Sequence, residues 1–191
     1  HIRFHGDVIA DNLLYQTLSS PSAIPHVVFL LGVGGDFVEL AENDEFHRRW
    51  AINKDRAAEA EKGMKLAMQA LKEKGSPVSQ NELYALINEN IRSLRGESTP
   101  ENVIESYLAS SKLVKKNPYG EYGLKEWPTI SPRGVKDKAY LVLTKSGSPM
   151  HFREVALAIN KMNWTKKKEH PQTIHNELIK DSRFVLVGRG T

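Results

Sequence analysis

Apolar residues recur along the chain at helical spacing in two successive groups of three segments, and each group is followed by a β-type pattern. In the first group the segments span residues 64–71, 83–91 and 103–108. The turn Asn117-Pro118-Tyr119-Gly120 then separates two short apolar runs, which predicts a β-hairpin. The order of three helices and a hairpin is typical of a winged helix.

The second group repeats this order in the last third of the chain. Helices are predicted at residues 137–144, 151–161 and 171–180. The run Phe184-Val185-Leu186-Val187 then predicts a strand, and Gly188-Arg189-Gly190 predicts the turn of a second hairpin. We expect its second strand to be cut off by the end of the chain.

The two groups are related by an internal repeat. Gly75-Ser76-Pro77 precedes a helix in the first group, and Gly147-Ser148-Pro149 precedes the equivalent helix 72 positions later. The block from Pro100 to Val114 matches that from Pro171 to Val185 at an offset of 71. Two blocks at nearly one spacing predict a duplicated unit of about 60 to 70 residues.

The first 56 residues are similar to a partial third copy. Helices are expected around Val8–Leu18 and Ala23–Leu31, and strands at Phe37–Leu40 and Phe46–Ile52. No counterpart of the first helix is visible. We therefore predict a mainly α fold with small β-hairpins (α+β), built of tandem winged-helix repeats, two of them clear and one degenerate or truncated at the N-terminus. The predicted domains are residues 1–56, 57–130 and 131–191, joined by a polar segment at 54–60, which is expected to be helical, and a stiff connector with two prolines at 128–132.

Composition restricts the function classes. The chain of 191 residues has no cysteine, which excludes disulfides, thiolate zinc sites and cysteine nucleophiles and fits a reducing cytoplasm. Its longest apolar stretch, residues 27–33, is far shorter than the roughly 20 residues of a membrane span. Because the chain does not begin with methionine, we expect it to be a fragment of a longer protein.

Charge is distributed unevenly. Residues 1–56 hold 5 Lys and Arg against 8 Asp and Glu, residues 57–127 hold 10 against 10, and residues 128–191 hold 12 against 5. The basic excess therefore lies in the last third, where it would attract an acidic partner such as nucleic acid.

Five segments of the last third closely resemble the HARE-HTH domain: residues 122–128, 131–140, 151–156, 170–180 and 183–190. More narrowly, this region is similar to the C-terminal part of bacterial sigma-factor-like proteins, in which a region 4 helix-turn-helix precedes such domains. The N-terminal domain of the RNA polymerase delta subunit has a similar fold. The resemblance extends less specifically over residues 57–121. Region 4 itself is not present, so recognition of the promoter −35 element is not assigned to these residues.

The resemblance implies a winged-helix fold, an association with transcription, contact with double-stranded DNA, and a cytoplasmic, nucleoid-associated location in a bacterium. In a winged helix the third helix enters the major groove and the wing lies along the backbone. The candidate base-reading residues are Gln172, Thr173, His175 and Asn176. The candidate phosphate contacts are Lys166, Lys167, Lys168, Lys180, Arg183 and Arg189. The alternative interpretation is that these polar faces only meet water.

The third helix of the preceding unit has a different surface. It presents Glu101 and Glu105, and carboxylates directed at phosphates would be repelled. This favours a second hypothesis, in which the chain is a protein-interaction array that docks on RNA polymerase or another transcription component through an acidic face. An acidic run at residues 39–45 in the first unit would serve the same purpose.

We expect no enzyme activity, no cofactor and no metal site. His170 and His175 are five positions apart and therefore lie on different faces of a helix, and His1 and His5 lie at the chain terminus. The glycines at 32–35 lack the Lys and Ser/Thr of a phosphate-binding loop and are expected to end a helix. Trp50 and Trp127 end hairpins at comparable places and are expected to pack in a core or between units. The chain is expected to be a monomer.

Overall fold

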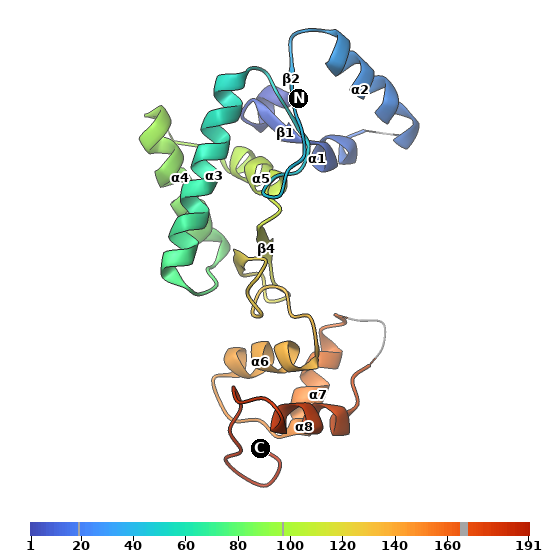
Figure 1. Cartoon of the computed structure of the whole chain (residues 1–191), viewed down its shortest axis with the longest axis vertical. Helices are drawn as coiled ribbons and strands as arrows, with labels where there is room; N and C mark the ends of the chain where they lie inside the picture. The colour runs from blue at the N-terminus through green and yellow to red at the C-terminus, as the bar shows by residue number, and fades with distance from the viewer. Residues whose placement is uncertain (19, 97, 165–167) are drawn as a thin grey trace. The chain divides into compact units, whose positions relative to one another are not determined.

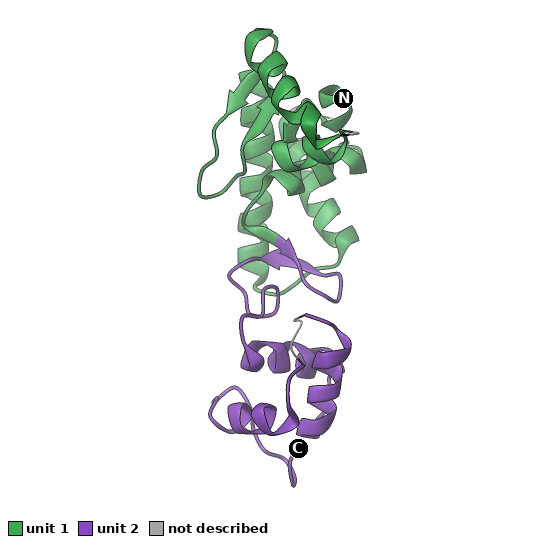
Figure 2. Ribbon diagram, turned by 90° about the vertical axis from the view of Figure 1, so that its right-hand side faces the viewer, with its two compact units in different colours: residues 1–114 green, residues 115–191 purple. Residues whose placement is uncertain are grey.

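The computed structural model describes residues 1–18, 20–96, 98–164 and 168–191. The chain divides into two compact units, residues 1–114 and 115–191 (Figures 1 and 2). In the N-terminal unit the elements are the 3-10 helices η1 (Ile2–His5) and η2 (Pro21–Ala23), the strands β1 (Val8–Ala10), β2 (Val38–Leu40) and β3 (Arg49–Ala51), and the helices α1 (Asp11–Gln16), α2 (Ile24–Val33), α3 (Lys54–Lys74), α4 (Gln80–Arg95) and α5 (Glu101–Ser110). Strand β4 (Val114–Lys116) follows, and the C-terminal unit continues with β5 (Tyr122–Leu124), α6 (Val135–Ser146), α7 (Phe152–Lys161) and α8 (Pro171–Ile179).

The N-terminal unit contains a small antiparallel sheet in the order β1-β3-β2. Trp50 of β3 pairs with Ile9 on one side and with Glu39 on the other. Its side chain is 1% exposed, and its indole N–H donates to the carboxylate of Asp11 (2.8 Å). The predicted core position of Trp50 is thus confirmed. The predicted helix at residues 8–18 is wrong in its first part, because residues 8–10 pair with β3 as a strand and only α1 is helical.

The helices α3 and α4 form the base of this unit. Asn53 caps the start of α3. The helix is capped at its other end by Gly75, whose backbone is in the left-handed conformation (φ 68°). Gly63 permits close packing, since a Cβ at this position would lie 2.7 Å from Cγ1 of Ile91 in α4. Residues 54–60, predicted as a polar helical linker, are helical as expected and form the first turns of α3. Ala57 and Ala60 within them are buried, so this segment is part of the core.

The helix α5 is covered by the N-terminal residues of the chain. Ser106 is fully buried and donates from its hydroxyl to the carbonyl of Val8 (2.8 Å), and the Tyr107 hydroxyl donates to the carbonyl of Gly6 (3.0 Å). Gly6 has φ 74°, and a Cβ there would lie 2.2 Å from Cγ1 of Val103. The structure therefore differs from the predicted boundary at residue 56, since the segment before it packs on α5 in one compact unit.

The C-terminal unit begins with the hairpin of β4 and β5 around the left-handed Gly120 (φ 84°). The amide of Asn117 donates to the carbonyl of Thr129 (3.1 Å), and Ile130 is 3% exposed. The region 128–132, predicted as a stiff connector, is an ordered turn that packs on the hairpin and leads into α6. Lys145 of α6 forms an ion pair with Glu121, which explains why this hairpin groups with the C-terminal helices.

Helices α6, α7 and α8, drawn in orange to red in Figure 1, enclose a core of small and branched side chains. Its buried members are Ala139, Val142, Val155, Ala156, Ile159 and Ile174. The partly buried Trp164 and Phe184 pack against it. Residues 184–187, which follow α8, are not assigned to a strand, so the predicted strand is not formed among the described residues.

The structure confirms a mixed α+β fold with small antiparallel sheets. The predicted helices of the last third agree with α6, α7 and α8 to within two residues at each end. Among the described residues, no helix combines the length and the apolar character needed to cross a membrane.

Candidate nucleic-acid interface

The helix α8 is amphipathic, and its two faces have different roles. Ile174 is fully buried against α6 and α7. Gln172, Thr173 and Asn176 are exposed on the opposite side. The amide of Gln172 donates to the Asn176 side-chain oxygen (3.2 Å), so two of the predicted base-reading residues lie next to each other on one turn. The structure thus brings three of the four predicted base-reading residues together.

The start of α8 is fixed by a polar cluster that connects the three helices. Glu169, one residue before the N-cap, accepts a 2.7 Å hydrogen bond on its carboxylate from the ammonium of Lys138 in α6. Asn160 in α7 accepts from the backbone N–H of Glu169 (2.7 Å) and donates to its carbonyl (2.9 Å). Lys138 is 5% exposed. Lys138, Asn160 and Glu169 thus hold the chain in place immediately before the exposed face of α8.

Sequence reasoning did not identify this cluster. Lys138 precedes the buried Ala139, and a single lysine in a helical pattern normally indicates the solvent face. The signal that was present is the position of the polar Asn160 and Glu169 on either side of a lysine-rich segment.

Both α7 and α8 begin with a histidine cap. The Nδ1 atom of His151 accepts from the backbone N–H of Arg153 (3.3 Å), and the Glu154 carboxylate accepts from the backbone N–H of His151 (2.8 Å). His170 accepts in the same way from Gln172 (3.2 Å). These bonds satisfy backbone N–H groups that have no partner within the helix.

Basic side chains flank the exposed face of α8. Lys168, Lys180 and Arg189 are all exposed. The ammonium of Lys180 lies 3.4 Å from the carboxylate of Glu177. A solvent-exposed ion pair of this kind contributes little to stability. Lys166 and Lys167, predicted as phosphate contacts, lie outside the described residues.

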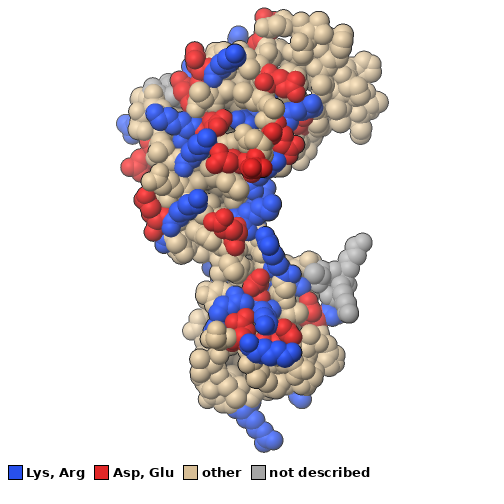
Figure 3. Space-filling view, viewed as in Figure 1, with Lys and Arg blue, Asp and Glu red and all other residues tan. Residues whose placement is uncertain are grey.

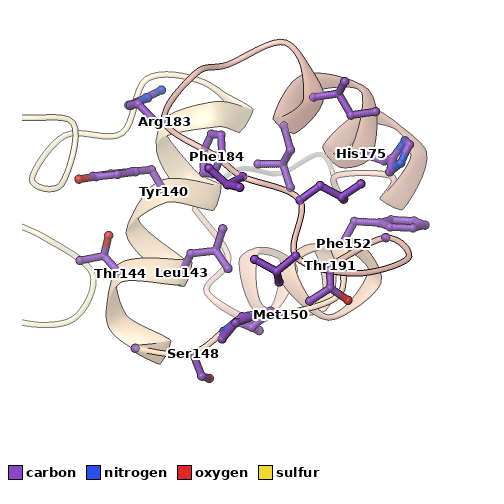
Figure 4. Close-up of a pocket in the computed structure, with 18 residues that line it drawn as sticks. Tyr140, Leu143, Thr144, Ser148, Met150, Phe152, His175, Arg183, Phe184 and Thr191 are labelled. Atoms are coloured by element: carbon purple, nitrogen blue, oxygen red, sulfur yellow. The ribbon is translucent and has the colours of Figure 1, made fainter.

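His175 does not lie on the exposed face. Its ring packs edge-on against Phe152 (4.9 Å between ring centroids), and its Nδ1 atom is buried without a hydrogen-bond partner in the described part of the chain. The side chain lines a cavity between α8 and the C-terminal segment (Figure 4). The prediction that His175 reads base edges is therefore replaced by a packing role.

Arg183 also has an internal role in place of the predicted phosphate contact. Its guanidinium bonds to the carboxylates of Asp181 (2.7 Å) and Asp137 (3.1 Å) and lies over the ring of Tyr140 (5.1 Å). Hydrogen bonds from Arg183 hold the pKa of Asp181 down at about 2, and the same bonds raise the pKa of the guanidinium. Because the guanidinium of Arg183 already bonds to the carboxylates of Asp181 and Asp137, it is not available to bind a phosphate.

The predicted acidic face is only partly open. Glu101 and Glu105 are exposed on α5, and Glu105 accepts a hydrogen bond from the hydroxyl of Tyr84 (3.0 Å). In the acidic run, Glu39 pairs with Arg48, Glu42 with Lys112 and Glu45 with Lys65. The face drawn in Figure 3 shows red and blue side chains interspersed over the N-terminal unit. The acidic run is thus largely neutralised by neighbouring bases.

The histidines do not gather into a metal site. Within the described ranges, no group of three or more His, Asp or Glu side chains is placed to hold a metal ion. His1 and His5 approach each other, with 3.2 Å between their Nε2 atoms, and burial lowers the pKa of His5. Two imidazoles alone provide fewer ligands than a protein zinc site requires.

Comparison with curated proteins and with solved structures yields no match. Comparison with protein families yields HARE-HTH, a helix-turn-helix domain whose description names ASXL and restriction endonuclease, over residues 133–191. The match covers α6, α7, α8 and the C-terminal segment, which confirms the resemblance seen in the sequence for this region. It starts at Arg133 and does not include residues 57–132. Residues 133–191, less than half of the chain, are thus similar to the HARE-HTH domain, a helix-turn-helix domain.

Proposed function

We propose that residues 133–191 bind double-stranded DNA, with α8 in the major groove. The observation that carries the proposal is the exposed polar face of α8. The opposite face of this helix is fixed to the core by the buried Ile174, and the helix lies in the region that matches a helix-turn-helix domain. Asn176 and Gln172 match the donor and acceptor pattern of adenine, and the methyl group of Thr173 matches that of thymine. An A·T-containing site is therefore the preferred target.

The phosphate backbone would be held by the flanking bases. Lys168 precedes α8, Lys180 follows it, and Arg189 lies in the turn at residues 188–190. Cations at both ends of a recognition helix fix its register on the duplex without reading sequence. Lys166 and Lys167 extend this set as a prediction from the sequence.

We further propose that the chain is the C-terminal part of a bacterial sigma-factor-like transcription regulator, located in the cytoplasm with the nucleoid, and has no enzymatic role. Support comes from the sequence resemblance and from the order of α3, α4, α5, β4 and β5, which is that of α6, α7, α8 and the C-terminal segment. Gly75 and Gly147 end the first helix of each set in the same left-handed conformation, with φ 68° and 63°. The proposed architecture is thus a tandem of winged-helix units with one DNA-contacting member.

A titration of the whole chain against a labelled duplex of about 20 base pairs, repeated at several salt concentrations, tests the DNA proposal. We expect log affinity to fall linearly with log salt, and substitution K180A or R189A to reduce the slope by about 0.9 each. Asn176→Ala is expected to cost about 1–3 kcal/mol on an A·T-containing site and less on other sequences. Lys72→Ala, an exposed lysine of α3, is the matched control and should leave the slope unchanged.

Absence of binding at low salt would refute the proposal. An equal effect of K72A and K180A would refute the assignment of the interface to α8.

The alternative function is docking on RNA polymerase or another transcription protein. It is favoured by Glu101 and Glu105, which remain exposed although the rest of α5 is covered by the N-terminal segment. The E101K/E105K variant should then lose retention on immobilised polymerase in the absence of DNA. Equal retention of the variant and the unmodified chain would exclude this face.

A further inference from the structure

The helix α2 presents an apolar face on the surface of the N-terminal unit. Its inner side is fixed to the core, because Leu31 is buried in a cluster that includes Ile2 of η1. On its outer side, Phe29 and Leu30 are each 66% exposed and Val33 is 67% exposed. A single exposed apolar residue is normal on a protein surface, but three large ones on a helix of 10 residues form a contiguous patch.

The exposed residues of α2 lie on one stripe of the helix. Phe29 and Val33 are four positions apart and therefore lie one above the other in the middle of the stripe. By the same helical period, Leu30 lies on one side of them and Gly32 on the other. Gly32 leaves a gap, since a Cβ built at this position would have no heavy atom of the described residues within 4 Å. Projecting side chains beside a gap are the arrangement in which two helices pack on each other.

The sequence around this patch carries no charge. Between Asp11 and Asp36 the chain has no Asp, Glu, Lys or Arg. Figure 3, drawn from the same side as Figure 1, shows a continuous tan surface where Figure 1 places α2. A partner recognised by opposite charges, or a membrane surface with anionic headgroups, therefore finds no ionic contact on α2. The surface that matches this patch best is another uncharged apolar surface.

We propose that α2 packs against α2 of a second copy of the chain, related to the first by a two-fold axis. In such a pair each contact is made twice, so the patch of one copy covers the patch of the other. When the two helices run antiparallel, Phe29 of each copy lies over the gap at Gly32 of the other, and Val33 packs beside it. Because α2 belongs to the N-terminal unit, the pairing does not involve α8 and does not rest on the proposed DNA binding.

The exposed area agrees with a weak dimer. Phe29, Leu30 and Val33 together present apolar surface on the order of 350 Å², which is comparable to the largest patch on a typical monomer. With the exposed Pro25 and His26 beside them, the two copies together would bury about 1,000 Å², the lower limit of specific interfaces. We expect a dissociation constant in the range of about 1–100 µM. The proposed dimer differs from the monomer expected from the sequence.

Sedimentation velocity of the whole chain without DNA, from about 1 to about 100 µM, tests the proposal. We expect the mass to rise from the 21.5 kDa monomer towards twice that value. Leu30→Glu should weaken association by about tenfold or more, because the interface would have to desolvate a carboxylate. Leu157→Glu, which changes an aliphatic residue of α7 that is 71% exposed, is the matched control and should not change association.

The substitution Gly32→Gln separates the pairing of two copies from the stability of one. It removes a glycine from a helix and places the new side chain in open space, so the single copy should be at least as stable as before. In the dimer the same side chain occupies the gap that receives Phe29 of the other copy. Association should therefore weaken by about fivefold or more.

Hydrogen exchange of the unmodified chain gives a readout that does not depend on the folding of a variant. Peptides from residues 24–33 should exchange more slowly at high than at low protein concentration. A monomer at all concentrations, exchange of α2 that is insensitive to concentration, or a dimer weakened equally by L30E and L157E would each overturn the proposal.

Discussion

The ion pair of Lys138 and Glu169 should stabilise the packing of α6, α7 and α8 far more than the more exposed ion pair of Lys145 and Glu121, which also involves α6. The side chain of Lys138 is 7% exposed and that of Glu169 19%, and their charged atoms lie 2.7 Å apart. Substitution K138M retains the aliphatic stem and removes the ammonium. The Glu169 carboxylate is then left with its charge uncompensated in a mostly buried site.

The structure sets the magnitude. Removing one member of a fully buried ion pair costs about 3–5 kcal/mol. Because Glu169 retains some contact with water, we expect K138M to cost about 2 kcal/mol, which corresponds to roughly 10 °C in Tm for a domain of this size. The double substitution K138M/E169L removes both charges and should recover most of the loss.

Lys145→Met is the matched control, since Lys145 is also in α6 and pairs with Glu121 near the surface. Its cost should stay below about 1 kcal/mol. The assay is urea denaturation followed by hydrogen exchange of peptides from α6, α7 and α8, which reports this unit separately. Equal costs of K138M and K145M, or a double variant no more stable than K138M, would refute the reasoning.

Three further predictions concern other contacts. Gly123→Ala should destabilise the hairpin by about 1–3 kcal/mol in a denaturation experiment, because the new Cβ would lie 2.7 Å from the indole of Trp127; unchanged stability would contradict this packing. Since the pKa of Asp181 is lowered from 3.8 to about 2 by Arg183, the stability from this pair is complete above pH 4 and is lost as the pH falls towards 2. D181N should remove this loss of stability at low pH. If D181N and the unmodified chain lose stability identically as the pH falls, the pair is not formed. Tyr107→Phe should cost about 1 kcal/mol and speed amide exchange in η1, because it removes the hydroxyl that holds the N-terminal segment; exchange as slow as in the unmodified chain would argue against that contact.

The helices of the last third were predictable because local signals agree with the tertiary structure. Apolar spacing locates α6, α7 and α8, and Gly147 with φ 63° ends α6 as the sequence indicates. The strand β1 was not predictable from local pattern. Its pairing with β3, in which Ile9 lies opposite the distant Trp50, overrides the helical spacing that begins at Val8.

In the candidate interface too, some features follow from the local sequence pattern and others depend on tertiary contacts. The exposure of Gln172, Thr173 and Asn176 follows from the helical period of α8 alone. The positions of His175 and Arg183 depend on segments distant in sequence, since His175 packs on Phe152 of α7 and Arg183 bonds to Asp137 at 46 positions' separation. A helical wheel does not contain this information.

The cover that the N-terminal residues place on α5 affects the order in which the chain can fold during synthesis. The bond between Val8 and Ser106 joins residues 98 positions apart, whereas α6, α7 and α8 pack within fewer than 50 residues. At about 5–20 residues per second, β1 waits for about 5–20 s on the ribosome before its partner helix is made. β3 is made earlier and can pair with β1, but the side of β1 that packs on α5 is uncovered during that interval. The N-terminal unit should therefore be the part of the chain that depends on chaperones and that aggregates when translation is slowed near α5.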